Sequence, residues 1–221
     1  VDRLGAQRVD IALFPSEKVS EPTQQVLMPF AFTVNDLSVP EVNLIQGLKT
    51  TVLRDVSGSL NTDKVQHTIN LKSLHQGDAE YTGQLAINGK RPFALDGEVD
   101  ASVHDGDNSY SAKIIAKGDL KRLNLGLSAD SAVQGSQGQL NGQGTLSVQL
   151  LDGLYTHQGH MDFKHVNPKL FWDSLPKADF DVALDADPSG ASATADTSKD
   201  TAERQPVQGR WTLVNHLPLT L

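Results

Sequence analysis

The sequence predicts an all-β fold, arranged as a long antiparallel meander. Apolar and polar residues alternate with a period of two along most of the chain, which is typical of strands that bury one face. The connections carry hairpin residues, at Asn88-Gly89, Asp105-Gly106 and Asp152-Gly153. Helical spacing competes with this pattern only between Pro168 and Trp172. We therefore expect about ten consecutive strands, several of them near ten residues long.

The expected strands follow one another along the chain, each with an apolar and a polar side. In the first half the alternating residues are Phe30, Phe32 and Val34; Val65, His67, Ile69 and Leu71; Tyr81, Leu85 and Ile87; and Phe93, Leu95, Val99, Ala101 and Val103. In the second half they are Tyr110, Ala112, Ile114 and Ala116; Leu123, Leu125, Leu127 and Ala129; Leu140, Leu146, Val148 and Leu150; Tyr155, Met161 and Phe163; Phe180, Val182 and Leu184; and Trp211 and Leu213. The intervening positions are mostly Thr, Ser, Gln, Asn, Asp and Lys, so each strand is expected to be apolar on one face only.

Two segments interrupt the alternation. The first, from Val166 to Lys177, is bounded by prolines and reads as a crossover with Leu170, Phe171 and Trp172 at its centre. The second, residues 188–206, is rich in Ala, Ser, Thr and Asp without periodicity, and we expect a flexible loop there. Otherwise residues 1–221 read as a single continuous unit. The chain begins without Met and ends in an apolar stretch, from which we expect a fragment of a larger protein.

Composition excludes several classes of function. The formal net charge is −8 and the pI is about 5.2, and no cluster of Lys and Arg is present. This argues against nucleic acid as a partner and against docking on an anionic membrane surface. There is no cysteine, which excludes thiolate metal sites and thiol nucleophiles. No stretch approaches the roughly 20 apolar residues of a membrane-spanning helix.

The sequence offers no catalytic or metal-binding motif. His157, His160 and His165 are the densest histidine group, but strand geometry separates His157 from His165 by about 26 Å and turns His160 to the other face. Asp105 and Asp107 lack the remainder of a calcium loop and read as turn residues. Nucleophile elbows, phosphate loops and dinucleotide fingerprints are missing from the sequence. We expect a protein that is not an enzyme and needs no cofactor.

A meander that is apolar on one side must cover that side, and no helices are expected to do so. It can close into a barrel or sandwich, or stay partly open as a bent sheet with an apolar trough. Periodicity does not distinguish these two outcomes. In an open trough the lining would be Phe30, Phe32, Val34, Ile69, Leu71, Leu85, Ile87, Phe93, Leu95, Val99, Ile114, Leu123, Leu125, Leu127, Leu146, Val148, Met161, Phe163, Phe180, Val182, Leu184, Trp211 and Leu213.

Several segments, taken in order, resemble the family of the bacterial translocation and assembly module subunit TamB. The similar stretches are the run from Pro29 to Val39, Leu53 to Leu60, Ile69 to Leu74, Tyr81 to Leu85, Arg91 to Leu95, Lys117 to Leu120 and Trp172 to Pro176. Together they extend over roughly residues 26 to 217. The individual motifs are degenerate, and the resemblance depends on the order of the segments.

The resemblance implies an open, U-shaped β-groove with an apolar interior, known as a β-taco. It also implies the periplasm of a Gram-negative bacterium, a full-length protein anchored in the inner membrane, and an Omp85-type outer-membrane barrel as partner outside this chain. The implied function is inner-to-outer membrane transport of phospholipid. Two alternatives remain: a chaperone-like β-surface for outer-membrane protein or autotransporter assembly, and a closed β-sandwich adhesin or structural module.

Overall fold

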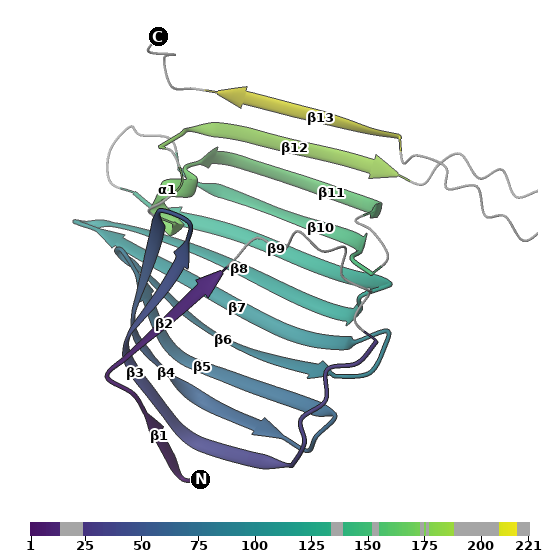
Figure 1. Cartoon of the computed structure of the whole chain (residues 1–221). Helices are drawn as coiled ribbons and strands as arrows, with labels where there is room; N and C mark the ends of the chain where they lie inside the picture. Colours follow the sequence, from purple (N-terminus) through teal and green to yellow (C-terminus); the bar gives the residue numbers. More distant parts are fainter. Residues whose placement is uncertain are drawn as a thin grey trace, which may run out of the picture.

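A computed structural model describes residues 1–13, 24–133, 139–151, 155–172, 175, 177–187 and 208–215 (Figure 1). These residues form one sheet of 13 strands and one short helix, α1 (Pro168–Phe171). The strands are β1 (Arg3–Gly5), β2 (Arg8–Leu13), β3 (Phe32–Gln46), β4 (Lys49–Thr62), β5 (Gln66–Gln76), β6 (Ala79–Asn88), β7 (Ala94–Asp105), β8 (Asn108–Asp119), β9 (Arg122–Ala132), β10 (Asn141–Gln149), β11 (Tyr155–Val166), β12 (Phe180–Asp187) and β13 (Gln208–Asn215).

From β3 to β13 the strands pair in chain order, and every one of these pairs is antiparallel. The predicted all-β meander is therefore confirmed. Among the described residues, no pairing joins β13 back to β1 or β2, so the sheet does not close into a barrel (Figure 1). Of the two outcomes left by the sequence, the structure has the open one. The loop expected at residues 188–206 lies outside the described residues.

The N-terminal strands depart from the predicted antiparallel order. Both β1 and β2 pair with β3 in parallel, β1 along its first half and β2 along its second. Side chains bind β2 to β3: the Asn43 amide donates to Asp10 Oδ1 at 2.9 Å, and Arg8 Nε lies 3.6 Å from Glu41 Oε1. Within β2, Arg8 Nε also donates to Asp10 Oδ1 at 2.8 Å. These two hydrogen bonds, from Arg8 first, hold the pKa of Asp10 below its ordinary value. Side chains thus support a pairing that strand alternation does not reveal.

Tight turns in the sheet rely on glycine at the first of two loop positions. Gly47, Gly77 and Gly106 have φ near +60° and follow β3, β5 and β7 directly, as in hairpins whose first loop residue needs a positive φ. The hairpin predicted at Asp105-Gly106 is confirmed. At Asn88-Gly89 a hairpin does join β6 to β7, which pair directly at Ile87 and Leu95, but its loop runs on to Phe93 instead of closing in two residues, and Gly89 is buried against the backbone of Val26.

Register irregularities lie toward both ends of the sheet, with most of them on β3 to β5. The register shifts between Val34 and Leu37 on β3, between Arg54 and Gly58 on β4, and between Leu71 and Leu74 on β5. A β-bulge inserts an extra residue, which bends the strand and increases its twist. No shift occurs from β6 to β10, where the ladder is regular. Two further shifts lie at the other end, between Ser147 and Val148 on β10 and between Phe163 and Val166 on β11. The shifts on β3 to β5 lie where Figure 1 shows the strands strongly curved.

The pairing register gives the sheet two chemically different faces, because directly paired residues point to the same side. One row of direct partners is polar from end to end and comprises Arg8, Glu41, Arg54, His75, Glu80, Ser102, Ser111, Asp130 and Asn141. This side is called the polar face below. The other side is the apolar face, and its rows are described next.

Candidate functional site: the apolar face

Two neighbouring rows cross the middle of the apolar face. The first comprises Val34, Leu60, Ile69, Leu85, Gly97, Ala116, Leu125, Leu146, Gly159 and Ala186. The second comprises Leu37, Gly58, Leu71, Gly83, Val99, Ile114, Leu127, Gly144, Met161 and Leu184. Neither row contains a polar side chain. They run from β3 to β12 across the strands, so apolar surface is continuous over ten strands of the sheet.

Most of the predicted lining residues lie on this face. Besides those in the two central rows, Phe32, Ile87, Leu95, Leu123 and Val148 lie in a row on one side of them, and Phe163 and Val182 lie in a row on the other. Phe180 shares their face by its spacing along β12. Trp211 and Leu213 are paired with Leu184 and Val182, and only their backbone is described.

Two predicted lining residues are not in strands. Phe93 has φ +60° in the turn before β7 and is buried, so it fills the end of the sheet instead of lining a strand. Phe30 precedes β3, is exposed, and packs its ring 5.7 Å from that of Phe32. The alternation predicted a strand at both places, and in both the backbone turns out of the ladder.

Glycines keep the apolar face compact. A Cβ at Gly97 would lie 2.9 Å from Leu85 Cδ1, one at Gly144 would lie 3.0 Å from Met161 Cβ, and one at Gly159 would meet the side chain of Leu146. In each case a large neighbour in the same row occupies the space above the glycine. Large side chains therefore extend over the glycine of the neighbouring strand and fill the space that a side chain there would occupy.

Burial distinguishes an exposed central strip of the apolar face from its two margins and from the ends of the central rows, which are buried at Val34 and Leu184. Ile69, Val99 and Ile114 in the central rows are 43%, 42% and 45% exposed. Leu123 at one margin is 4% exposed, and Val103 at the other is 3% exposed. β-branched apolar side chains of this kind are normally buried, and a contiguous exposed group of them marks a binding surface more often than a lone exposed residue does.

One margin is covered by residues 24–30, here called the strap. Its backbone bonds to strand ends and turns: Val26 N donates to Gly89 O at 2.7 Å, and Met28 N donates to Lys64 O at 3.0 Å. His67, buried on the apolar face, places Nε2 3.0 Å from Val26 O and Nδ1 2.8 Å from Thr62 Oγ1. The strap thereby pairs one ring nitrogen of the buried histidine, and Thr62 at the end of β4 pairs the other. Of this segment, only Phe30 was predicted to belong to the site.

The other margin is covered by α1. Tyr81 of β6, which lies on the apolar face as the direct partner of Ala101, donates a hydrogen bond from its hydroxyl to Phe171 O. Its ring lies 6.3 Å from that of Trp172 in an edge-on arrangement. The crossover predicted around Leu170, Phe171 and Trp172 is thus present, and it reaches strands that are far from it in sequence. The central strip of exposed residues lies between α1 and the strap.

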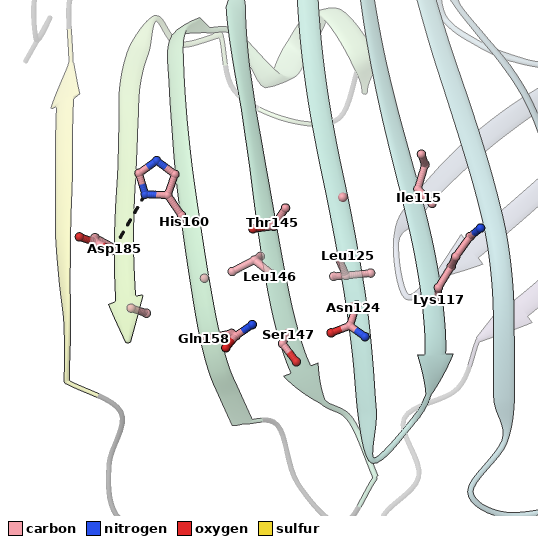
Figure 2. Close-up of a pocket in the computed structure, with 13 residues that line it drawn as sticks. Ile115, Lys117, Asn124, Leu125, Thr145, Leu146, Ser147, Gln158, His160 and Asp185 are labelled. Carbon is pink, nitrogen blue, oxygen red and sulfur yellow. Dashed lines mark ion pairs between the residues drawn. The ribbon is translucent and has the colours of Figure 1, made fainter. Parts of the chain in front are cut away.

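The polar face carries a shallow furrow of about 560 Å³ across β8–β12 (Figure 2). Polar side chains line it, including Lys117, Asn124, Thr145, Ser147, Gln158, His160 and Asp185. Asp185 lies 4.0 Å from His160 Nδ1, and both side chains are largely exposed. Such a pair contributes little stability in water. Because the furrow is open to solvent and most of its side chains are polar, we regard the apolar face as the better candidate site.

Several other charged groups form surface ion pairs. Lys113 Nζ lies 3.1 Å from Glu98 and 3.3 Å from Asp100, and hydrogen bonds to these carboxylates raise the pKa of Lys113. His165 pairs with Asp179, not with His157 or His160. Within the described part of the chain, no three His, Asp or Glu side chains are grouped closely enough to hold a metal ion.

Comparison with protein-family models, with curated proteins and with solved structures found no match to this chain. A search of the described helices for a span of membrane-crossing length and apolarity also found none.

Proposed function

We propose that this chain shields phospholipid acyl chains on its apolar face, as a segment of an envelope protein that carries lipid from the inner to the outer membrane. The observation that supports the proposal best is the exposed central strip of Ile69, Val99 and Ile114 between the strap and α1. In this proposal the apolar face is the inside of the bent sheet, and lipid chains lie along the rows, across the strands.

The energetics suit transient binding. An acyl chain that buries roughly 300 Å² on such a surface gains several kcal/mol at about 25 cal/mol per Å². A free energy of this size is enough to bind the lipid and small enough to let it dissociate or slide along the face. Because the two central rows are apolar from β3 to β12, a chain can slide from one strand to the next without crossing a polar side chain.

The wider setting of the proposal follows from the resemblance to the TamB family. In that setting the full-length protein spans the periplasm of a Gram-negative bacterium, is anchored in the inner membrane, and works with an Omp85-type barrel through parts outside this chain. The open sheet agrees with such a role, because a groove that continues into neighbouring segments needs unclosed edges.

A chaperone-like surface is the second candidate, and the edges of the sheet favour it. β13 pairs with β12 on one side, and among the described residues its other side has no partner strand. An extended segment of an unfolded outer-membrane protein could add to that edge by backbone hydrogen bonds. In that case a peptide, not a lipid, would be the ligand.

Organic extraction of the purified chain followed by mass spectrometry distinguishes the two candidates. We expect phospholipid to copurify and to be displaced by added phospholipid, but not by peptides that mimic the last strand of an outer-membrane barrel. Phospholipid-free protein that binds such peptides would reverse the order of the candidates. Protein that binds neither would contradict both.

A further inference from the structure

The segment between β11 and β12 takes a route that the sheet does not require. Val166 and Phe180 are direct partners across these adjacent strands, so a short turn could connect them. Instead α1 contacts β7, and Tyr81 of β6 bonds to Phe171. β11 and β6 are five strand spacings apart, which is about 24 Å along the sheet. Figure 1 shows α1 beside the ends of strands well removed from its own connection.

The site that receives this segment is part of the apolar face. Tyr81 is paired with Leu74 and Ala101, and its row continues through Ala112 and Ala129. This row adjoins the central row that contains Val99 and Ile114. The alanines that follow Tyr81 in this row have small side chains and leave space above the sheet where α1 reaches it. Trp172 packs edge-on against the Tyr81 ring.

The segment has little stability of its own. α1 is a single turn, its N-cap residue Asn167 makes no side-chain capping bond, and none of its residues is fully buried. An isolated turn is not stable in water, because helix formation has a costly nucleus. Leu170, Phe171 and Trp172 are half-buried, so docking against the sheet is what removes their apolar surface from water.

We propose that the α1 segment, Asn167–Trp172, is a built-in competitor for the ligand of the apolar face. This rests on the proposed function. Docked, the segment covers the margin of the face at Tyr81, and an acyl chain cannot lie over that margin at the same time. A lipid that extends from the central rows toward Tyr81 displaces the segment, and a docked segment confines lipid to the central strip. The two occupants are therefore linked, and each lowers the affinity of the face for the other.

Tryptophan fluorescence and binding measurements test the competition. The sequence has only two tryptophans, so Trp211→Phe leaves Trp172 as the sole reporter. Vesicles of phosphatidylcholine are added, either with ordinary acyl chains or with brominated chains that quench tryptophan on contact, and protein-bound lipid is then separated by gel filtration. We expect bound lipid to shift Trp172 emission to longer wavelength, as for a ring released into water, with little quenching by the brominated chains.

Binding by variants gives an independent readout. Trp172→Ala removes the aromatic pair with Tyr81, and Tyr81→Phe removes the hydrogen bond to Phe171 O. Both changes weaken docking, so the apparent affinity for the lipid should rise about two- to tenfold, the range expected for loss of one such contact. Lys169→Ala is the matched control, because Lys169 belongs to the same turn and is exposed, and its affinity should equal that of the parent chain.

The outcomes separate this inference from the function on which it rests. Lipid binding with unchanged Trp172 emission and equal affinity in all variants would overturn the competition and leave the proposed function standing. Strong quenching by brominated chains without a shift to longer wavelength would overturn it as well, because lipid and docked α1 would then be neighbours. If no variant binds lipid, the proposed function fails and the competition fails with it.

Discussion

Leu125→Arg should leave the sheet folded and remove most of its bound phospholipid. Leu125 is half-buried in a central row of the apolar face, between Ala116 and Leu146. Loss of part of its buried surface costs about 1–2 kcal/mol, and on an open face the guanidinium can extend to water. The melting temperature should therefore fall by less than about 10 °C. A charge lying across the path of an acyl chain should reduce copurifying lipid at least tenfold, because its burial under lipid carries a large desolvation cost.

Thr145→Arg is the matched control on the polar face. Thr145 is exposed on β10, next in sequence to Leu146, and belongs to the row that contains Gly126 and His160. Arginine there should change neither the melting temperature nor the lipid content. Thermal melting and lipid extraction of the two variants side by side make the comparison. Complete unfolding of the Leu125 variant would indicate that the face is a closed core, which would contradict the transport proposal for this chain.

Gly83→Ala should be among the most destabilising substitutions in the sheet for its size. Gly83 lies in the second central row on β6, where an added Cβ would meet the carbonyl oxygen of Glu98 and lie 3.1 Å from Val99 Cα. Both neighbours are backbone atoms of β7, so the strands would have to separate. We expect the free energy of unfolding to fall by about 1–3 kcal/mol, as for other overpacked sites. Urea denaturation measures the change.

Gly126→Ala is the control for this substitution. Gly126 is on the polar face of β9, and the nearest atom to an added Cβ is Ile115 Cβ at 3.9 Å. Because glycine inside a strand is about 0.5–1 kcal/mol less favourable than alanine, this variant should be as stable as the parent chain or slightly more stable. If both variants lose the same stability, the close approach of β6 and β7 is not the cause.

The sequence predicted the sheet from alternation, and the register shows why that prediction was sufficient. Each alternating run, such as Ile69 and Leu71 or Leu125 and Leu127, has its apolar residues in register with those of the next run. A slip by one residue on any strand would turn its apolar residues to the polar face, so alternation fixes the pairing as well as the strands. It could not predict openness, because closed and open sheets need the same pattern.

Turn geometry was harder to predict than strands. Asn88-Gly89 has the composition of a two-residue turn, yet the hairpin there has a longer loop, and the backbone of Val26 approaches Gly89 too closely for a side chain. Gly47 and Gly77, which do make tight turns, are preceded in the sequence by glutamine and not by Asn or Asp. A short motif reports local preference, and contact with a distant segment overrides it.

The features that shape the site arise from contacts between distant residues. The bulge at Asp55, with φ +52°, and the contact of Tyr81 with Trp172 depend on the packing of the sheet and leave no local pattern. The strap is apolar at Val26, Leu27 and Met28 but forms no strand there, so the period-two pattern could not predict where these three residues lie. The parallel pairing of β1 and β2 with β3 is likewise set by the edge of the sheet that is available to them.

Photocrosslinking from two adjacent isoleucines tests the central claim most directly. Ile114 lies on the apolar face and is 45% exposed, whereas Ile115 is its neighbour on β8 and lies on the polar face beside Gly126. A photoreactive phenylalanine analogue is placed at one position or the other, and the purified protein is irradiated in the presence of phospholipid vesicles. The proposed function predicts a lipid adduct from position 114 and little or none from position 115. Equal adducts from both positions, or an adduct from position 115 alone, would contradict it.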